Sequence, residues 1–461
     1  MENPPGETPL SHRDLRSRYR SYLLAVLATI VAFENGERWA VGILVQSIKT
    51  DLHLSDTQLG LLTGMAYAFF NASLGVWIAR WADRGNRAII IAVTTALWSA
   101  ATALCGVAGN FLQLLLMRVA VAVGEAGCVP VAPSLIADYF GRAERPRAMS
   151  RYLVGSLLGP AIWFFLAGRL NEYYGWRRAF VCLGLPGVAV ALLAGLTLKE
   201  PRRAALHVSR GPLVPSVPPS MKKVGVMLWG NQTFRHLLLF FSISAFFNYG
   251  IVQWIPPYFA RSFGLQTGQV GTWLAIIFGA GGVVGTYLGG ELVSRFLTCN
   301  EQLQLRAIGI WIACYGLMSV CIYLTHSYQI AFVLLAIGSV GNAAIYGPLF
   351  ATLQTLVPPH LRAQSLAVLA FFFNLIGAGL GPLMVGLLSD FLHPWAGEES
   401  LRYALVALSP GYCWSSWYLW RACRSVTRDI EAICNEYEVD ADAEIDCLGV
   451  ADDRVSAKSC R

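Results

Sequence analysis

The chain has 461 residues, of which 55% are hydrophobic and only 14% are charged. Such a composition excludes an ordinary soluble domain and is typical of an integral membrane protein. The formal net charge of +7 arises from Lys and Arg residues in the loops, so it indicates membrane topology and gives no reason to expect a nucleic acid partner.

Twelve windows of about 20 predominantly apolar residues are each long enough to cross a hydrocarbon core roughly 30 Å thick as a helix. They are predicted at 22–46, 58–80, 88–110, 112–138, 149–171, 177–198, 236–260, 268–293, 304–325, 328–356, 364–391 and 400–420. The expected fold class is an all-α integral membrane protein with twelve transmembrane helices. Residues 1–20 are polar and basic, and the first apolar run is too long for a signal-peptide core, so we expect the first helix to be retained.

The two sides of the predicted spans differ in their basic residues, because one side carries 27 Lys and Arg residues and the other six. Cytoplasmic loops are enriched in these residues, so both termini are predicted to be cytoplasmic and the protein to lie in the plasma (inner) membrane. The eleven cysteines are scattered without a CxxC pair, which favours packing roles and predicts neither a disulfide nor a metal site.

The first predicted span carries charged residues at its centre, in the segment FENGERW. Glu37 and Arg38 lie three and four positions after Glu34, so on a helix all three project from one face. A charged residue within the bilayer costs at least about 2.5 kcal/mol, so this face is predicted to point away from lipid and to serve a function.

Arg118 and Glu125 in the fourth predicted span are seven positions apart and also share a helix face. A rise of about 1.5 Å per residue places Glu37 and Arg118 about 13 Å and about 9 Å from the outer side, so they are predicted to pair. Glu34 and Glu125 fall near the midplane, where Arg38 could pair with either. The alternative interpretation is a set of structural ion pairs, although buried pairs stabilise less than apolar packing does.

The longest internal loop is rich in proline and basic residues and divides the twelve spans into six and six. A faint repeat links LLGP at 157–160 to GLGP at 379–382. These features predict two pseudo-symmetric six-helix bundles around a central site, the layout of alternating-access transporters. The predicted domains are a cytoplasmic tail at 1–21, bundles at 22–198 and 236–421, a cytoplasmic linker at 199–235 and an acidic cytoplasmic tail at 422–461. From Asp429 onward this tail holds ten acidic residues and is predicted to be disordered.

Charged residues nearly vanish from the second predicted bundle, and aromatic and amide groups take their place. A cavity with charged groups on one wall and apolar rings on the other would suit an amphiphile, although lipid contact or packing is an equal alternative for any single ring. The candidate substrate-binding residues of this half are Asn248, Tyr249, Trp254, Asn342, Tyr346 and Asn374.

The segment GVWIARWADRGNRAIIIA at 75–92 resembles the signature loop of the major facilitator superfamily. With the Glu37–Arg38 pair and the segment RVAVAVGEAG at 118–127, the chain resembles the Spinster-type branch of that superfamily. Ala79 stands where the signature usually has glycine, and Glu37 stands where the Spinster-type pattern has aspartate.

The resemblance implies a conformational latch at the signature loop. In facilitators this loop contacts the opposite bundle, so Asp83 is expected at the start of the eleventh helix while an arginine reaches Asp138. The expected latch residues are Asp83, Arg84, Arg87 and Asp138.

The resemblance also implies roles for the charged residues of the first and fourth helices. Arg38, Arg118, Glu37 and Glu125 are expected to handle substrate. Proton coupling is expected at Glu125 foremost, because the depth estimate places it nearest the midplane, and also at Glu37 and at Glu34, which is not part of the Spinster-type pattern. The five formal charges sum to −1, so one bound proton would neutralise this cluster.

No phosphate-binding GxxxxGK[ST] loop, HExxH or GxSxG motif occurs, so we expect neither an enzyme nor a cofactor. The predicted function is a proton-coupled secondary carrier that moves a lysophospholipid, a sphingoid phosphate or a similar amphiphile. Alternatives are a facilitator-type carrier of small organic anions, sugars or drugs and, from another class, a membrane enzyme or a sensor. Protons and membrane lipids are the other expected partners, and a monomer is expected.

Overall fold

The computed structural model describes residues 12–141, 143–201, 229–296, 300–357 and 361–448. These residues form helices joined by short turns, and no strand occurs among them. The predicted all-α class is confirmed. Seven helices in the described part of the chain are long and apolar enough to span a membrane. The first helix, with its central charges, is not one of those seven.

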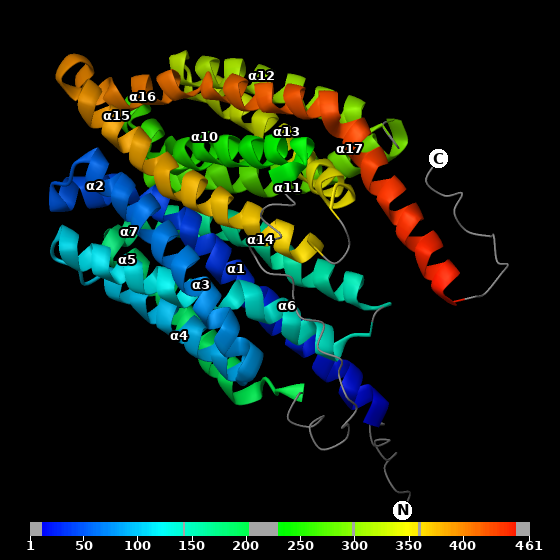
Figure 1. Cartoon of the computed structure of the whole chain (residues 1–461). Helices are drawn as coiled ribbons and strands as arrows, with labels where there is room; N and C mark the ends of the chain where they lie inside the picture. Colours follow the sequence, from blue (N-terminus) through cyan, green and yellow to red (C-terminus); the bar gives the residue numbers. More distant parts are fainter. Residues whose placement is uncertain (1–11, 142, 202–228, 297–299, 358–360, 449–461) are drawn as a thin grey trace, which may run out of the picture.

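The helices form two groups, which lie side by side in Figure 1. The first group contains α1 (His12–Leu52), α2 (Asp56–Gly60), the π-helical η1 (Leu61–Met65), α3 (Ala66–Arg84), α4 (Arg87–Cys105), α5 (Phe111–Glu125), α6 (Cys128–Tyr139) and α7 (Arg145–Thr197). The second contains α10 (Gln232–Phe263), α11 (Thr267–Phe296), α12 (Glu301–Leu324), α13 (Tyr328–Thr355), α14 (Arg362–Phe372), the π-helical η3 (Phe373–Leu380), α15 (Gly381–Ala396), the 3₁₀ turn η4 (Gly397–Glu399), α16 (Ser400–Leu408) and α17 (Gly411–Leu448).

Helix α7 covers two predicted spans, and its two helical parts meet at Gly175. The φ angle of Gly175 is 77°, in the left-handed region that glycine adopts without strain. Each group therefore contains six membrane-length segments. In the first group they are α1, α2 to α3, α4, α5 to α6 and the two parts of α7.

The two groups meet at one end of the molecule, where α2 packs against α15. We call this the Asp56 end, and we call the opposite end, where α4 begins and α6 finishes, the Arg87 end. Contacts of α1 with α10 and of α7 with α11 also join the groups. In Figure 1 the groups are closest at α2 and α15, and they diverge toward the start of α1 and the end of α17.

The segment containing α2 and α3 crosses the segment containing α14 and α15 where both contain a π-helical stretch, η1 and η3. Glycines allow the close approach. A Cβ atom on Gly60 would lie 2.6 Å from the carbonyl oxygen of Pro382, and one on Gly64 would lie 2.6 Å from that of Gly379. The backbones of the two groups therefore touch directly at this crossing.

Glycines also seat α1 against α7. A Cβ atom on Gly155 or Gly159 would collide with the backbone carbonyl oxygen of Ala28 or Ala32, respectively. Small residues spaced four apart allow this approach, and van der Waals contact is the main attraction between helices in lipid. The face of α1 that carries its charges is held in place by this contact.

We expect Gly159→Val to destabilise the fold, because its side chain forces α1 away from α7. Overpacking of this kind costs about 1–3 kcal/mol. Thermal unfolding in detergent, followed by tryptophan fluorescence, measures the effect. Gly290→Val is the matched control, since no atom lies within 4 Å of a Cβ atom placed there. Equal unfolding temperatures for the two variants would show that the α1–α7 contact is not tight.

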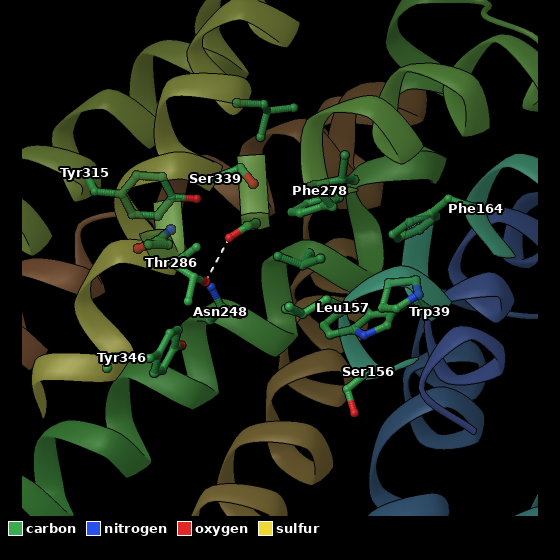
Figure 2. A pocket seen from close by; sticks show the side chains of 18 residues that line it. Trp39, Ser156, Leu157, Phe164, Asn248, Phe278, Thr286, Tyr315, Ser339 and Tyr346 are labelled. Carbon is green, nitrogen blue, oxygen red and sulfur yellow. Dashed lines mark hydrogen bonds between the residues drawn. The ribbon is translucent and has the colours of Figure 1, made fainter. Parts of the chain in front are cut away.

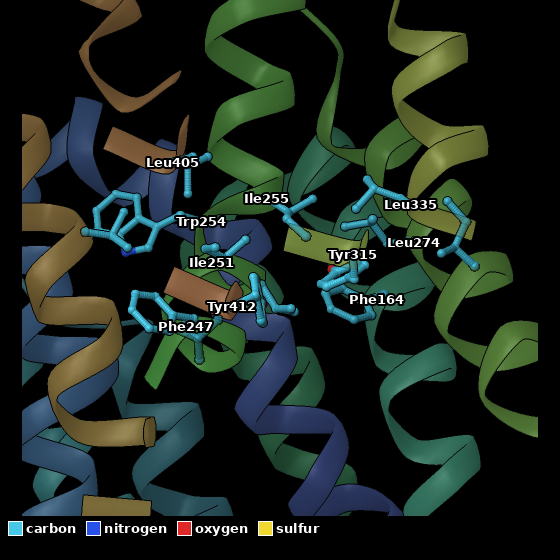
Figure 3. Close-up of a cluster of buried hydrophobic side chains, with 14 of the residues drawn as sticks. Phe164, Phe247, Ile251, Trp254, Ile255, Leu274, Tyr315, Leu335, Leu405 and Tyr412 are labelled. Carbon is cyan, nitrogen blue, oxygen red and sulfur yellow. The ribbon is translucent and has the colours of Figure 1, made fainter. Parts of the chain in front are cut away.

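Aromatic residues dominate the core of the second group. Figure 3 shows Phe247, Trp254 and Tyr412 among the buried aliphatic side chains that surround α10. The Trp254 ring nitrogen donates a hydrogen bond to the carbonyl oxygen of Pro382 at 3.0 Å. This bond ties α10 to α15 near the crossing.

The acidic C-terminal tail departs from the prediction of disorder, because α17 continues as a helix to Leu448. Asp429 holds the start of this extension against α10. Its carboxylate accepts hydrogen bonds from the backbone N–H and the hydroxyl of Thr233, at 2.8 and 2.7 Å. The prediction of disorder is therefore wrong for the residues up to Leu448, because acidity alone does not indicate whether a segment is helical. Residues 449–461 lie outside the described part of the chain.

Candidate functional site

The charged residues of α1 and α5 form one buried cluster. Arg118 donates a hydrogen bond to Glu37 at 3.2 Å, so the predicted pair is confirmed. Arg38 lies 3.3 Å from Glu125, which is one of its two predicted partners. Glu34 interacts electrostatically with Arg38. All three carboxylates are at most 2% exposed.

Two neutral side chains complete this cluster, and sequence reasoning missed both. The Tyr67 hydroxyl on α3 donates a hydrogen bond to Glu125 and accepts one from Arg38. The Thr102 hydroxyl on α4 donates a hydrogen bond to Glu37. Neither residue is charged, so neither stood out from its apolar surroundings in the sequence.

Oε2 of Glu37 and Oε1 of Glu125 are shielded from solvent, and neither accepts a hydrogen bond from the described residues. An ionised oxygen without a donor is costly in such surroundings, and the cluster carries one negative charge in excess. The geometry can therefore hold one proton on a carboxylate.

A cavity of about 420 Å³ lies between the two groups of helices (Figure 2). Apolar side chains form much of its wall, including Phe164 of α7 and Phe278 of α11, whose rings stack at 5.6 Å. Hydroxyl and amide groups occupy the rest. These are supplied by Ser156, Asn248, Thr286, Tyr315, Ser339, Asn342 and Tyr346.

The aromatic ring of Trp39 links the charged cluster to the cavity. Trp39 lines the cavity and directly follows Arg38 in α1. Its ring stacks on Tyr249 with centroids 5.3 Å apart and planes 8° apart. Arg38 keeps 21% of its side chain exposed, against at most 3% for Glu37, Arg118 and Glu125. Of these four charged residues, Arg38 is therefore the one whose side chain is partly accessible to solvent or substrate.

The structure divides the ten predicted substrate-binding residues among several places. Asn248, Asn342 and Tyr346 line the cavity as expected. Trp254 does not, because its ring is 1% exposed and packs in the core (Figure 3). The Asn374 side chain donates to the carbonyl of Ala370 in its own helical segment at 2.9 Å.

The charged residues were predicted to form one wall of the cavity, and the structure places them behind it. Arg38, Arg118, Glu37 and Glu125 are not among its lining residues, and neither is Tyr249. The charged side chains turn into the first group because their partners lie there, on α3, α4 and α5. Tyr249 covers Trp39 instead.

A second buried charge network closes the Asp56 end, and the sequence did not predict it. Both Nη atoms of Arg261 donate to the Asp56 carboxylate, each at 2.7 Å. Lys49 and the hydroxyl of Ser389 donate to the same carboxylate, also at 2.7 Å. Asp390 of α15 accepts the backbone N–H group of Asp56 at 3.0 Å.

This network joins the two groups of helices. Burial alone raises the pKa of Asp56, but hydrogen bonds and charge from Arg261, together with Lys49 and Ser389, hold the pKa at about 2. Asp56 is therefore ionised at any ordinary pH.

At the Arg87 end, Arg87 forms the centre of the expected latch region. It is 1% exposed and donates to Asp138 at 2.6 Å, so the predicted contact between an arginine and Asp138 is present. It also pairs with Glu200, a residue of the predicted linker that was not among the expected latch residues. The side chains of Asp83 and Arg84 lie outside the described part of the structure.

Comparison with known proteins identifies relatives along most of the chain. The sequence profile of the Major Facilitator Superfamily matches residues 27–382. An "MFS-type efflux pump" of Mycolicibacterium smegmatis is 28% identical over 412 residues, covering 88% of this chain and 94% of that protein. "Protein spinster homolog 1" of Xenopus tropicalis is 26% identical over 415 residues, covering 84% and 78%.

The fold also resembles that of a solved bacterial homologue of the human lysosomal transporter Spinster, in an inward-facing and unoccupied conformation. The TM-score is 0.79 at 28% sequence identity, and the match covers 92% of this chain and 99% of that chain.

Proposed function

Because this chain belongs to the major facilitator superfamily, whose members are membrane transporters and not enzymes, we propose that it is a proton-coupled carrier of an amphiphilic molecule. The substrate class is a lysophospholipid, a sphingoid phosphate or a similar single-chain lipid. In this proposal the bundles at 22–198 and 236–421 rock about the cavity, and the linker at 199–235 joins them on the cytoplasmic side. The cavity between the two groups is the observation that carries the proposal.

The composition of that cavity supports an amphiphilic substrate. Aromatic and aliphatic side chains can take an apolar tail, while Asn248, Asn342 and Tyr346 can bind uncharged parts of a head group. Arg38 directly precedes Trp39 of the cavity wall in the sequence, and its side chain is 21% exposed. Ligand sites of this kind are mostly apolar with a few polar groups that fix orientation. The similarity to Spinster homologues supports a transporter, and the lipid class is what the resemblance to the Spinster-type branch implies.

A carrier of small organic anions, sugars or drugs is the second candidate. The seven hydroxyl and amide side chains in the cavity wall favour it. Within this second class, a sugar or an uncharged drug fits the wall better than a small acid, because no Lys, Arg or His is among the described lining residues.

The conformation is proposed to be inward-facing. The buried network of Asp56 and Arg261 joins the groups at the end that the basic-residue count places outside. At the other end the ribbons diverge (Figure 1). Resemblance to an inward-facing relative supports this assignment. Both termini are then cytoplasmic, in the plasma (inner) membrane.

The latch is proposed at the Arg87 end. Arg87 holds the start of α4 against α6 through Asp138. Asp83 and Arg84 complete the latch by contacting the second bundle when that end closes.

Substrate class can be tested by thermal shift of the purified protein with lysophospholipids, sugars and organic acids. We expect single-chain lipids to raise the unfolding temperature, with an effect that grows with tail length. Thr286→Trp, which fills the cavity from α11, should abolish this shift. Val283→Trp is the matched control, because Val283 is 51% exposed on the same helix and does not line the cavity. Stabilisation by sugars or organic acids alone would favour the second candidate.

A further inference from the structure

A second cavity, unrelated to the substrate site, lies at the Arg87 end between α1, α6 and the start of α7. Its volume is about 450 Å³. Three arginines line it, Arg20, Arg147 and Arg151, together with Phe140, Ala143 and other small residues. One carboxylate, that of Glu144, is present and pairs with Arg20.

The positive charge of this cavity is only partly compensated. Arg147 and Arg151 are exposed, and neither has a hydrogen-bond or ion-pair partner among the described residues. Arg145, by contrast, is used within the fold, where it donates to the carbonyl oxygens of Ala137 and Phe140. Both uncompensated arginines lie in the first two turns of α7, where the helix dipole already disfavours cations. Such an arrangement favours an anionic ligand.

The face of α7 that carries these arginines continues into an apolar stripe. Arg147, Arg151, Val154 and Leu158 are spaced by four, three and four residues, so their side chains share one helix face. Val154 is 48% exposed and Leu158 is 47% exposed. Two cationic side chains are thus followed along the helix axis by two exposed apolar ones.

Tyrosines near the cavity indicate its depth in the membrane. Tyr139 immediately precedes Phe140, and the ring of Tyr19 lies 5.7 Å from that of Tyr139 and 6.3 Å from that of Tyr22. Tyrosine is enriched where the hydrocarbon core meets the head groups. This places the arginines at head-group level and the apolar stripe at acyl-chain level.

We propose that this cavity binds the head group of an anionic phospholipid. The phosphate contacts Arg147 and Arg151, with Arg20 behind them, and the acyl chains lie along Val154 and Leu158. Arginine suits phosphate because its planar donors can bind two oxygens at once, and basic pockets between helices on the cytoplasmic side bind such lipids. The apolar stripe is the reason to choose a lipid over free phosphate.

Native mass spectrometry of the full-length protein in detergent tests this proposal, with phosphatidylglycerol and phosphatidylcholine as probes. We expect retained phosphatidylglycerol in excess over phosphatidylcholine. Arg147→Gln/Arg151→Gln should weaken phosphatidylglycerol binding about thirtyfold. Arg295→Gln/Arg424→Gln removes the same charge from exposed positions of α11 and α17 and should leave binding unchanged.

Two further measurements separate lipid from free anion. Val154→Ser/Leu158→Ser should weaken phosphatidylglycerol binding, and glycerol phosphate should compete poorly because it lacks acyl chains. Equal loss of binding in both arginine double variants would overturn the proposal by showing a general surface-charge effect. Equal binding of the two lipids to wild type, or glycerol phosphate binding as tightly as the lipid, would also overturn it.

Discussion

Glu125→Gln is expected to bind substrate and exchange it down a gradient, yet to lose accumulation driven by a pH difference. Glu125 has one oxygen bonded to Tyr67 and Arg38 and one shielded oxygen without a donor among the described residues. An ionised oxygen without a donor is costly in a buried site. The glutamine imitates the protonated form permanently. The step that couples proton release to bundle movement is then absent.

Uptake into proteoliposomes with and without an imposed pH difference measures this loss. One pH unit supplies about 1.4 kcal/mol per coupled proton, or about a tenfold substrate gradient, and the variant should reach a ratio near one. Glu291→Gln, an exposed carboxylate near the end of α11, is the control and should accumulate normally. If Glu125→Gln keeps its full response while Glu37→Gln or Glu34→Gln loses it, coupling belongs to α1 instead.

Asp56→Asn is expected to shift the protein strongly away from the conformation closed at the Asp56 end. The substitution leaves the buried Arg261 without its carboxylate, and breaking a buried pair in this way costs about 3–5 kcal/mol, or at least about a hundredfold in the equilibrium. Opening of the Asp56 end exposes Arg261 to water, which removes the cost of keeping an unpaired charge buried. Spin labels at Thr50 and Trp395, in a background without native cysteines, should report longer distances by pulsed electron paramagnetic resonance.

Asp51→Asn is the control for this experiment. Asp51 lies near Asp56 in the chain but pairs with Arg177 inside the first group, so its loss should leave the label distances unchanged. Unchanged distances in Asp56→Asn would show that this network does not hold the groups together.

The same labels also provide a pH test. The pKa of Asp56 is lowered from 3.8 to about 2 in the closed arrangement, which corresponds to about 2 kcal/mol in its favour. A lowered carboxylate pKa stabilises the closed arrangement above about pH 4, and this stabilisation is lost as the pH falls through 2. The distances should therefore stay constant from pH 8 to pH 5.

Helical geometry was enough to predict much of the charged cluster. The rise per residue placed Glu37 level with Arg118, and Glu125 within reach of Arg38, because these partners lie on regular helices with interpretable depths. Tyr67 and Thr102 were not predicted, because an uncharged residue in a transmembrane helix does not stand out in the sequence as a buried charge does.

Contacts between the two groups could not be predicted in the same way. Asp56 and Arg261 are 205 residues apart, and their pairing depends on how α2 and α10 meet, which no local pattern encodes. Trp254 shows the reverse case, a residue that was predicted in the site but lies in the core. Its aromatic neighbours suggested a cavity, but an aromatic-rich segment has the same sequence pattern whether it lines a cavity or packs in a core.

The π-helical stretches η1 and η3 have a mechanical consequence. Helices bend most readily where the regular α-helical hydrogen-bond ladder is interrupted, and π-bulges are among the usual sites. Each of the two crossing segments thus consists of two regular helices joined by a π-helical stretch that bends more easily. The two π-helical stretches, η1 and η3, are in contact with each other. The outer parts α2 and α15 can then swing as levers while α3 and α14 stay in place. The force needed to part the Asp56 end is then set by the Asp56–Arg261 ion pair and the hydrogen bonds around it, and not by the whole contact area between the bundles.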